Sequence, residues 1–237
     1  MKFRGLDPST QLVRWGLVAV AAGIVIGATG PSTLAALSAM WDANRASLPW
    51  IFERLFAFLA YGALAGSVIY GLLLSTKILD AIAHRPITFT LHQDLASLGV
   101  GLAAVHGMLL TLDKSVPFSV GQVVVPGLAP YAPLWVGVGQ VAFYLMAAVL
   151  ASFYLRRRIG QRAWRLFHYL TFFAFIGATA HGLGAGTDSA TPWAWWLYVG
   201  ATLIVVFLFA YRVAASVGDR FERRAAMAAG PRPIRDL

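Results

Sequence analysis

The stretch LWVGVGQVAFYLMAAVLASFYL, residues 134–155, is 22 residues long and contains no charged side chain. Three arginines, Arg156, Arg157 and Arg158, follow it directly. A helix needs about 20 largely apolar residues to cross the hydrocarbon core of a bilayer. This stretch therefore predicts a transmembrane helix that ends at a charged membrane surface.

Comparable apolar stretches lie on both sides of it, at about 14–37, 50–75, 89–112, 164–186 and 193–216. Together with 134–155 they predict an all-α integral membrane protein, a six-transmembrane-helix bundle with short connections. We expect a short N-terminal segment at 1–13, a transmembrane domain at 14–216 and a basic tail at 217–237. The connection at 114–133 is apolar but contains four prolines, and we expect it to form an interfacial or re-entrant cap.

The composition of the chain agrees with a membrane protein. Hydrophobic residues make up 59% of the 237 residues and charged residues 12%, whereas soluble domains have about 25% charged residues. The absence of cysteine excludes a disulfide scaffold and a cysteine-ligated metal or iron–sulfur site. In so apolar a chain, the excess of 19 basic over 10 acidic residues indicates lipid headgroups rather than nucleic acid.

The basic residues also predict the orientation of the bundle. Connections on one side hold 16 of the 19, and the other side holds Arg45, Arg54 and Lys114. Because cytoplasmic loops of membrane proteins carry the excess of Lys and Arg, we expect both termini in the cytoplasm. The predicted localisation is the plasma (inner) membrane, crossed several times.

Four of the five histidines lie inside predicted spans, where ionisable side chains are costly and mark functional sites. His92 and His106 lie on the third span, and His168 and His181 on the fifth. These spans run in the same direction, so we expect His92 level with His168 near the cytoplasmic face and His106 level with His181 nearer the outside. The intervals of 14 and 13 residues each correspond to about 20 Å of helix. Facing pairs of neutral imidazoles suit a haem iron with two axial ligands.

Four other residues are candidates for haem binding. Gly99 is a small residue near the His92/His106 face of its helix and would leave room for a porphyrin. Arg162 and Arg165 would bind the haem propionates bidentately, or they act only as topology signals. Phe175 would pack between the two macrocycles, or it is an ordinary core or lipid-facing residue.

The interval on the fifth span raises a geometric difficulty. Thirteen residues place His168 and His181 about 140° apart on an ideal helix, so the two rings do not share a face. We expect this helix to tighten or bend near Gly177, or the two haems to meet it on different sides.

The two histidine intervals resemble those of the ferric reductase-like transmembrane domain family, which includes ferric reductases, NADPH oxidases and the bacterial haem-binding subunit of the methionine sulfoxide reductase system. The resemblance covers about residues 50–215. It implies two b-type haems, the inner held by His92 with His168 and the outer by His106 with His181. The motifs that carry it are Phe89–His92, Val105–Gly107, Trp164–Tyr169 and Ala180–Gly182.

The chain departs from the reductases and oxidases of that family after its last predicted span. It has no glycine-rich dinucleotide fingerprint there. We therefore expect electrons to come from a separate flavoprotein carrying FMN, or from quinol, and to leave to an external acceptor.

The sequence thus predicts the haem-binding, electron-transferring subunit of a membrane oxidoreductase, with no catalytic side chain of its own. Two alternatives stay open. The histidines would line a proton or metal-ion path in a transporter, although only Asp94 and Glu53 offer carboxylates near the membrane. Or the protein is a non-redox membrane partner whose histidines form only hydrogen bonds.

Overall fold

The computed structural model describes residues 35, 38, 39, 48–76, 78–81, 84–113 and 116–228. Apart from Ala35, the first predicted span at 14–37 lies outside these residues, as does the end of the tail at 229–237. The chain divides into two compact units, Met1–Ile51 and Phe52–Leu237. All four paired histidines belong to the second unit.

The described residues contain helices and no strand, which confirms the all-helical class. The long helices are α3, α4, α6 and α9, and the fifth predicted span is made of α7 and α8. Their bounds are α3 (Leu48–Thr76), the 3₁₀ helix η1 (Ile78–Ala81), α4 (Arg85–Leu109), α5 (Val120–Val124), α6 (Pro133–Ile159), α7 (Gln161–His168), α8 (Leu170–Ala185) and α9 (Pro192–Ala228).

Four helical stretches are long and apolar enough to cross a membrane, as expected of a multi-pass membrane protein in a lipid environment. They are Leu48–Thr76, Pro133–Ile159, Gln161–Ala185 and Pro192–Gly218, which correspond to the second, fourth, fifth and sixth predicted spans. Helix α4, the third predicted span, is 25 residues long but is not among the four, because its histidines and the pair Gln93–Asp94 lower its hydropathy. The total of six spans and the cytoplasmic position of the termini stay predictions.

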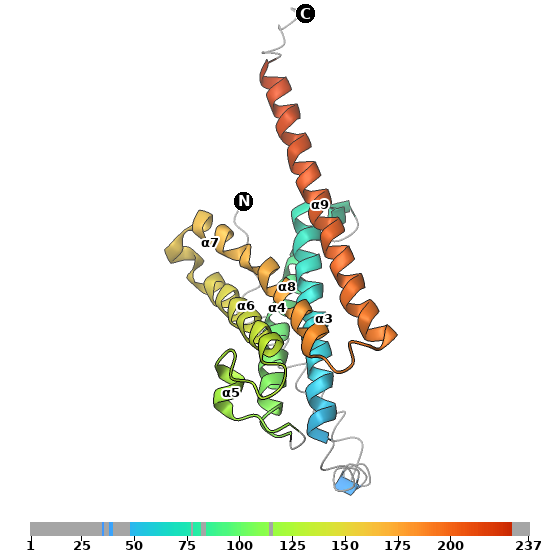
Figure 1. The fold of residues 1–237 in the computed structure, drawn as a ribbon. Coiled ribbons are helices and arrows are strands. Elements are labelled where there is room, and N and C mark those ends of the chain that lie inside the picture. The colour runs from blue at the N-terminus through green and yellow to red at the C-terminus, as the bar shows by residue number, and fades with distance from the viewer. Residues whose placement is uncertain are drawn as a thin grey trace, which may run out of the picture. The chain divides into compact units, whose positions relative to one another are not determined.

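The helices of the second unit alternate in direction. Figure 1 shows α3, α6 and α9 running one way and α4 and α7–α8 running the other. Helices α4 and α8 are therefore parallel. His92 and His168 lie toward the N-terminal ends of the third and fifth predicted spans, and His106 and His181 lie toward their C-terminal ends. A buried core between α3, α8 and α9 includes Leu64, Phe175 and Tyr198.

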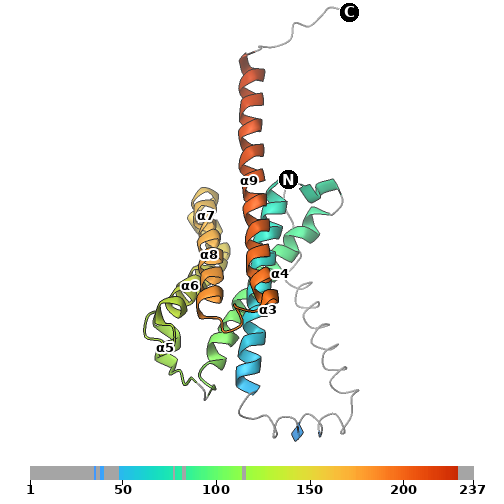
Figure 2. The ribbon, with the colours of Figure 1, turned by 45° about the vertical axis from the view of Figure 1, so that its right-hand side comes forward.

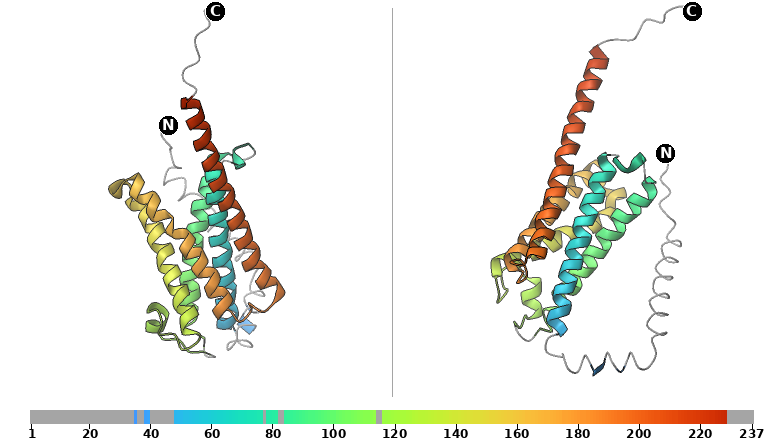
Figure 3. Two further views of the ribbon diagram at one scale, coloured as in Figure 1. Left: turned by 45° about the horizontal axis from the view of Figure 1, so that its top comes forward. Right: turned by 90° about the vertical axis from the view of Figure 1, so that its right-hand side faces the viewer.

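Helix α9 is the longest element, with 37 residues. Its C-terminal part continues beyond the other helices (Figures 2 and 3). The predicted tail at 217–237 therefore does not begin at a helix end. Residues 217–228 contain no proline and several alanines and arginines, which favour continuation of the helix.

The fifth predicted span is interrupted at Tyr169, between α7 and α8. The Tyr169 N–H donates to Leu166 O, three residues back, and the Phe172 N–H donates to Tyr169 O in the same way. These i→i−3 bonds tighten the helix locally. The change of geometry that we expected near Gly177 therefore lies two turns earlier, whereas α8 passes through Gly177 without a break.

The segment 116–132 folds against α6. It contains α5, which begins with a capping box formed by Ser119 and Gln122. Gln140 of α6 donates from Nε2 to the carbonyl oxygens of Gln122 and Val123, at 2.8 and 2.6 Å. A small apolar cluster of Phe118, Ala129 and Val136 lies beneath it. The segment 116–132 is thus packed at the end of α6, and its interfacial or re-entrant position stays a prediction.

Candidate functional site

The four histidines of the third and fifth predicted spans lie in two pairs, and they are the pairs expected from the sequence. The ring centroids of His92 on α4 and His168 on α7 are 6.0 Å apart, with ring planes inclined by 75°. Those of His106 on α4 and His181 on α8 are 6.2 Å apart, inclined by 66°. The fifth histidine, His84, is exposed and precedes α4.

Three of the four rings are held by backbone carbonyl groups. His92 Nδ1 lies 2.8 Å from Ser67 O, His106 Nδ1 lies 3.1 Å from Glu53 O, and His181 Nδ1 lies 2.9 Å from Trp135 O. A carbonyl oxygen only accepts, so Nδ1 must donate its proton in each case. The Nε2 atom is then left with a lone pair for a metal ion.

His168 is held differently. Its ring stacks on the ring of Trp164, one turn earlier on α7, with centroids 5.1 Å apart and planes inclined by 27°. Trp164 also contacts Phe153 of α6 edge-on. Within the described part of the chain, no hydrogen bond holds the His168 ring. Aromatic packing therefore replaces the carbonyl contact that the other three rings have.

Glycines on neighbouring helices make room for two of the rings. A Cβ atom on Gly139 of α6 would lie 2.5 Å from Cγ and Nδ1 of His181. A Cβ atom on Gly71 of α3 would lie 3.1 Å from Cε1 of His92. Real Cβ contacts do not fall below about 3 Å because atoms there overlap, so His181 in its position requires glycine at residue 139.

The separation of the rings matches a shared metal ion better than a direct hydrogen bond. Two imidazoles that bind one ion from opposite sides, with bonds of about 2 Å and about 1.1 Å from nitrogen to ring centroid, have centroids about 6.2 Å apart. A direct N–H···N hydrogen bond of about 2.9 Å would bring the centroids to about 5 Å. The observed separations are 6.0 and 6.2 Å. The free Nε2 atoms of three rings and the ring separation of both pairs are thus compatible with a haem held between two imidazoles.

Gly99, Arg162 and Arg165 were also predicted to bind haem, and of these Gly99 has a different neighbour from the one expected. A Cβ atom on Gly99 would lie 3.3 Å from Leu64 N and 3.5 Å from Ala60 O. Gly99 thus lets α3 approach α4, and the backbone of α3 fills the space that we expected for a porphyrin. Arg162 and Arg165 are exposed on α7.

Phe175 is 3% exposed and lies in the core. Its ring stacks on the ring of Tyr61 on α3, with centroids 6.1 Å apart. The Tyr61 hydroxyl bonds to that of Thr179 at 3.1 Å, and the Tyr61 ring contacts Tyr198 of α9 edge-on. On α3, Tyr61 lies between Glu53 and Ser67, so this aromatic cluster lies between the levels of the two pairs.

Two charged side chains lie close to the pairs. Glu53 Oε1 is 3.1 Å from His106 Nδ1, and its side chain is 15% exposed. It also lies within electrostatic range of His181. The charge near His168 is of opposite sign, because Arg212 of α9 lies within electrostatic range of that ring. From the sequence, Arg212 is one of the 16 basic residues that predict the orientation of the bundle, and Glu53 is one of two carboxylates near the membrane.

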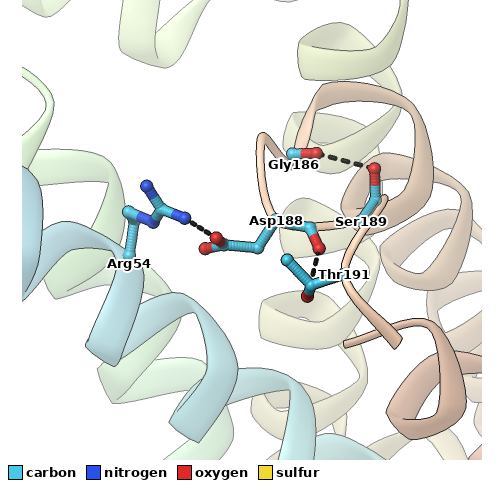
Figure 4. A network of polar contacts seen from close by, with 5 residues as sticks. All are labelled: Arg54, Gly186, Asp188, Ser189 and Thr191. Carbon is cyan, nitrogen blue, oxygen red and sulfur yellow. Dashed lines mark hydrogen bonds and ion pairs between the residues drawn. The ribbon is translucent and has the colours of Figure 1, made fainter. Parts of the chain in front are cut away.

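An ion pair fixes the chain next to Glu53. Arg54 of α3 pairs with Asp188 in the loop between α8 and α9 (Figure 4). The same loop is closed by Thr191 Oγ1, which donates to Asp188 O at 2.7 Å, and by Ser189 Oγ, which donates to Gly186 O at 2.8 Å. This network ties the loop after α8 to the first part of α3.

No family model, no curated protein and no solved structure matches the chain.

Proposed function

We propose that the chain is a membrane cytochrome that holds two b-type haems and conducts single electrons across the bilayer. The observation that carries this proposal is the repeated geometry of the two pairs, with centroids 6.0 and 6.2 Å apart and Nδ1 occupied by a carbonyl oxygen in three of the four rings. His92 with His168, and His106 with His181, would each hold one haem through their Nε2 atoms.

The number of donors at each pair favours haem over a bare metal ion. Among the described residues, no group of three or more His, Cys, Asp or Glu side chains is placed to hold a metal ion. Two imidazoles leave a bare ion short of the ligands that it needs, whereas a porphyrin brings four nitrogens of its own. When bound, haem supplies an iron that accepts and releases one electron.

The residues of the chain would set the position of each site. The carbonyl oxygens of Ser67, Glu53 and Trp135 orient three rings, and Trp164 orients the fourth. The 14-residue interval on α4 separates the two levels by about 20 Å of helix, a large part of the roughly 30 Å hydrocarbon core. The apolar and aromatic core around Tyr61 and Phe175 is buried between the levels.

The two alternatives have less support. A proton or metal-ion path needs polar or acidic groups along its length, but the region between the levels contains aromatic rings and the hydroxyls of Tyr61 and Thr179. A purely hydrogen-bonding role would account for the three bonds from Nδ1 to carbonyl oxygens, but it does not explain why the rings lie in two pairs about 6 Å apart. The electron donor that we propose is a separate flavoprotein with FMN, or quinol, and the acceptor is external.

The test is a reduced-minus-oxidised absorption spectrum of protein purified from haem-replete cells. We expect b-type bands and about two haems per chain. His92→Ala and His168→Ala should remove one haem, and His106→Ala and His181→Ala should remove the other. His84→Ala is the matched control because His84 is exposed and unpaired with another histidine ring; it should keep both haems. Absence of b-type bands, or unchanged haem content in His106→Ala, would overturn the proposal.

A further inference from the structure

The two histidine pairs have different electrostatic surroundings. At the His106/His181 pair, the Glu53 carboxylate is 3.1 Å from His106 Nδ1, in addition to the Glu53 carbonyl oxygen at the same distance. At the His92/His168 pair, the corresponding side chain is the neutral hydroxyl of Ser67, whose Oγ is 3.2 Å from His92 Nδ1. Among the described residues, only the His106/His181 pair therefore has a carboxylate in contact with a ring nitrogen.

The other charged groups near the pairs do not cancel this difference. Arg54 follows Glu53 on α3, but its charge is offset by the ion pair with Asp188. Asp94 is two residues from His92 and thus about 200° around α4 from it. Arg212, near His168, adds a positive charge to the surroundings of the pair that lacks the carboxylate.

A carboxylate bonded to a ligand histidine has a known physical effect. It accepts the Nδ1 proton, increases the electron density on the imidazole and makes the ring a stronger donor through Nε2. A negative charge nearby also stabilises the more positive, oxidised metal, most strongly where the surroundings are apolar. Both effects lower the reduction potential of the metal that the imidazole binds.

We propose that Glu53 is a positioning residue that lowers the reduction potential of the haem held by His106 and His181 below that of the haem held by His92 and His168. This inference rests on the two-haem function proposed above. An electron at equilibrium would then reside on the His92/His168 side. Transfer to the His106/His181 side would be the uphill step, and the electron that arrives there would be the stronger reductant for the acceptor.

The test is a redox titration of the purified holoprotein with dithionite and mediators, followed by absorption. The single-haem variants His92→Ala and His106→Ala assign each potential to its pair. We expect two unequal potentials in the wild-type protein, with the lower one at His106/His181. Glu53→Gln keeps the shape and the acceptor but removes the charge. It should raise only the lower potential, by at least a tenfold change in the reduction equilibrium, which is about 59 mV for one electron.

Two further variants separate charge from structure. Ser67→Ala is the matched control at the other pair and should leave the lower potential unchanged. Glu53→Asp keeps the charge and should stay closer to the wild-type potential than Glu53→Gln does. Loss of this haem from Glu53→Gln with retention in Glu53→Asp would also support the role of the charge.

The outcomes distinguish this inference from the function on which it rests. Two haems whose potentials are the same in wild type and Glu53→Gln would overturn the role of Glu53 and leave the cytochrome proposal intact. Loss of the His106/His181 haem from both Glu53→Gln and Glu53→Asp would also overturn the role of Glu53, because a carboxylate at residue 53 would then not be enough to keep this haem bound. A wild-type protein without haem would overturn the proposed function itself.

Discussion

The His92/His168 and His106/His181 pairs have nearly the same ring separation, 6.0 and 6.2 Å, but they are held in position by different means. In the second pair, both rings bond through Nδ1 to backbone carbonyl oxygens of neighbouring helices. In the first pair, only His92 does so. His168 instead stacks on Trp164 at the end of a helix that is interrupted at the next residue.

This difference implies that the pairs will respond differently to substitution. Backbone atoms of packed helices have little freedom to move, because protein interiors are close-packed. The His106/His181 pair is therefore rigid and should lose its geometry completely when it is disturbed. The His92/His168 pair depends on a side chain and on an interrupted helix, so it should adjust and weaken by degrees.

The largest expected effect comes from adding one methyl group beside His181. In Gly139→Ala, the new Cβ would overlap Cγ and Nδ1 of His181 at 2.5 Å. Because the ring is also tied to Trp135 O, it must leave its position. We expect haem content to fall from about two to about one per chain. The pyridine haemochromogen assay measures this change.

Gly71→Ala is the matched variant at the other pair. Its Cβ would lie 3.1 Å from Cε1 of His92, a contact that a shift of a few tenths of an ångström relieves. We expect the Gly71→Ala variant to retain most of the haem held by His92 and His168. Equal haem loss in the two glycine variants would contradict the contrast between a rigid and an adjustable pair.

The sequence was sufficient to predict the pairing because it depends on few variables. Intervals of 14 and 13 residues on two parallel helices define two levels, and side chains at the same level of neighbouring helices meet. Helices α4 and α8 run in the same direction because one long helix, α6, lies between them in the chain, and short connections make successive helices alternate in direction. Helix α4 itself is a weaker prediction as a span, because its polar residues, the proposed ligands His92 and His106 among them, lower its hydropathy.

The contacts that orient the rings could not be predicted in the same way. Carbonyl oxygens of Ser67, Glu53 and Trp135 carry no signature of residue type, so sequence does not reveal which of them meets an imidazole. The sequence indicates room for a ring only through small residues on the same helices as the histidines, such as Gly99 on α4. The close approach instead involves Gly71 and Gly139 on neighbouring helices, and these positions depend on how the helices pack.

A smaller effect is expected from the stack that orients His168. Trp164→Leu removes the aromatic contact, which is worth about 0.5–1.5 kcal/mol for a ring pair. Haem affinity at His92/His168 should therefore fall about two- to twelvefold, while the other site stays unchanged. The rate of haem transfer to apomyoglobin, with one site at a time removed by histidine substitution, measures the change.

Trp164→Phe is the control for this prediction. It keeps a ring that can stack on His168 and removes an indole N–H that has no hydrogen-bond partner among the described residues. We expect an affinity close to that of the wild type. If phenylalanine and leucine weakened the site equally, the larger indole ring, rather than stacking by any aromatic ring, would be what holds His168 in position.

The smallest effect is expected at Ser67, where the side chain and the backbone contribute separately. The Ser67 hydroxyl lies 3.1 Å from His92 O and 3.2 Å from His92 Nδ1, but the shorter bond of the ring, 2.8 Å, is to Ser67 O. Ser67→Ala removes the hydroxyl and keeps that carbonyl oxygen. The variant should lose about 0.5–1.5 kcal/mol of stability, the usual net value of one hydrogen bond, and retain both haems.

Thermal unfolding in detergent measures the loss of stability, and the haem content of the same preparation measures the retention of haem. Haem loss from His92/His168 in Ser67→Ala would mean that the hydroxyl orients the ring, and the two pairs would then both depend on the residue type of their α3 partner.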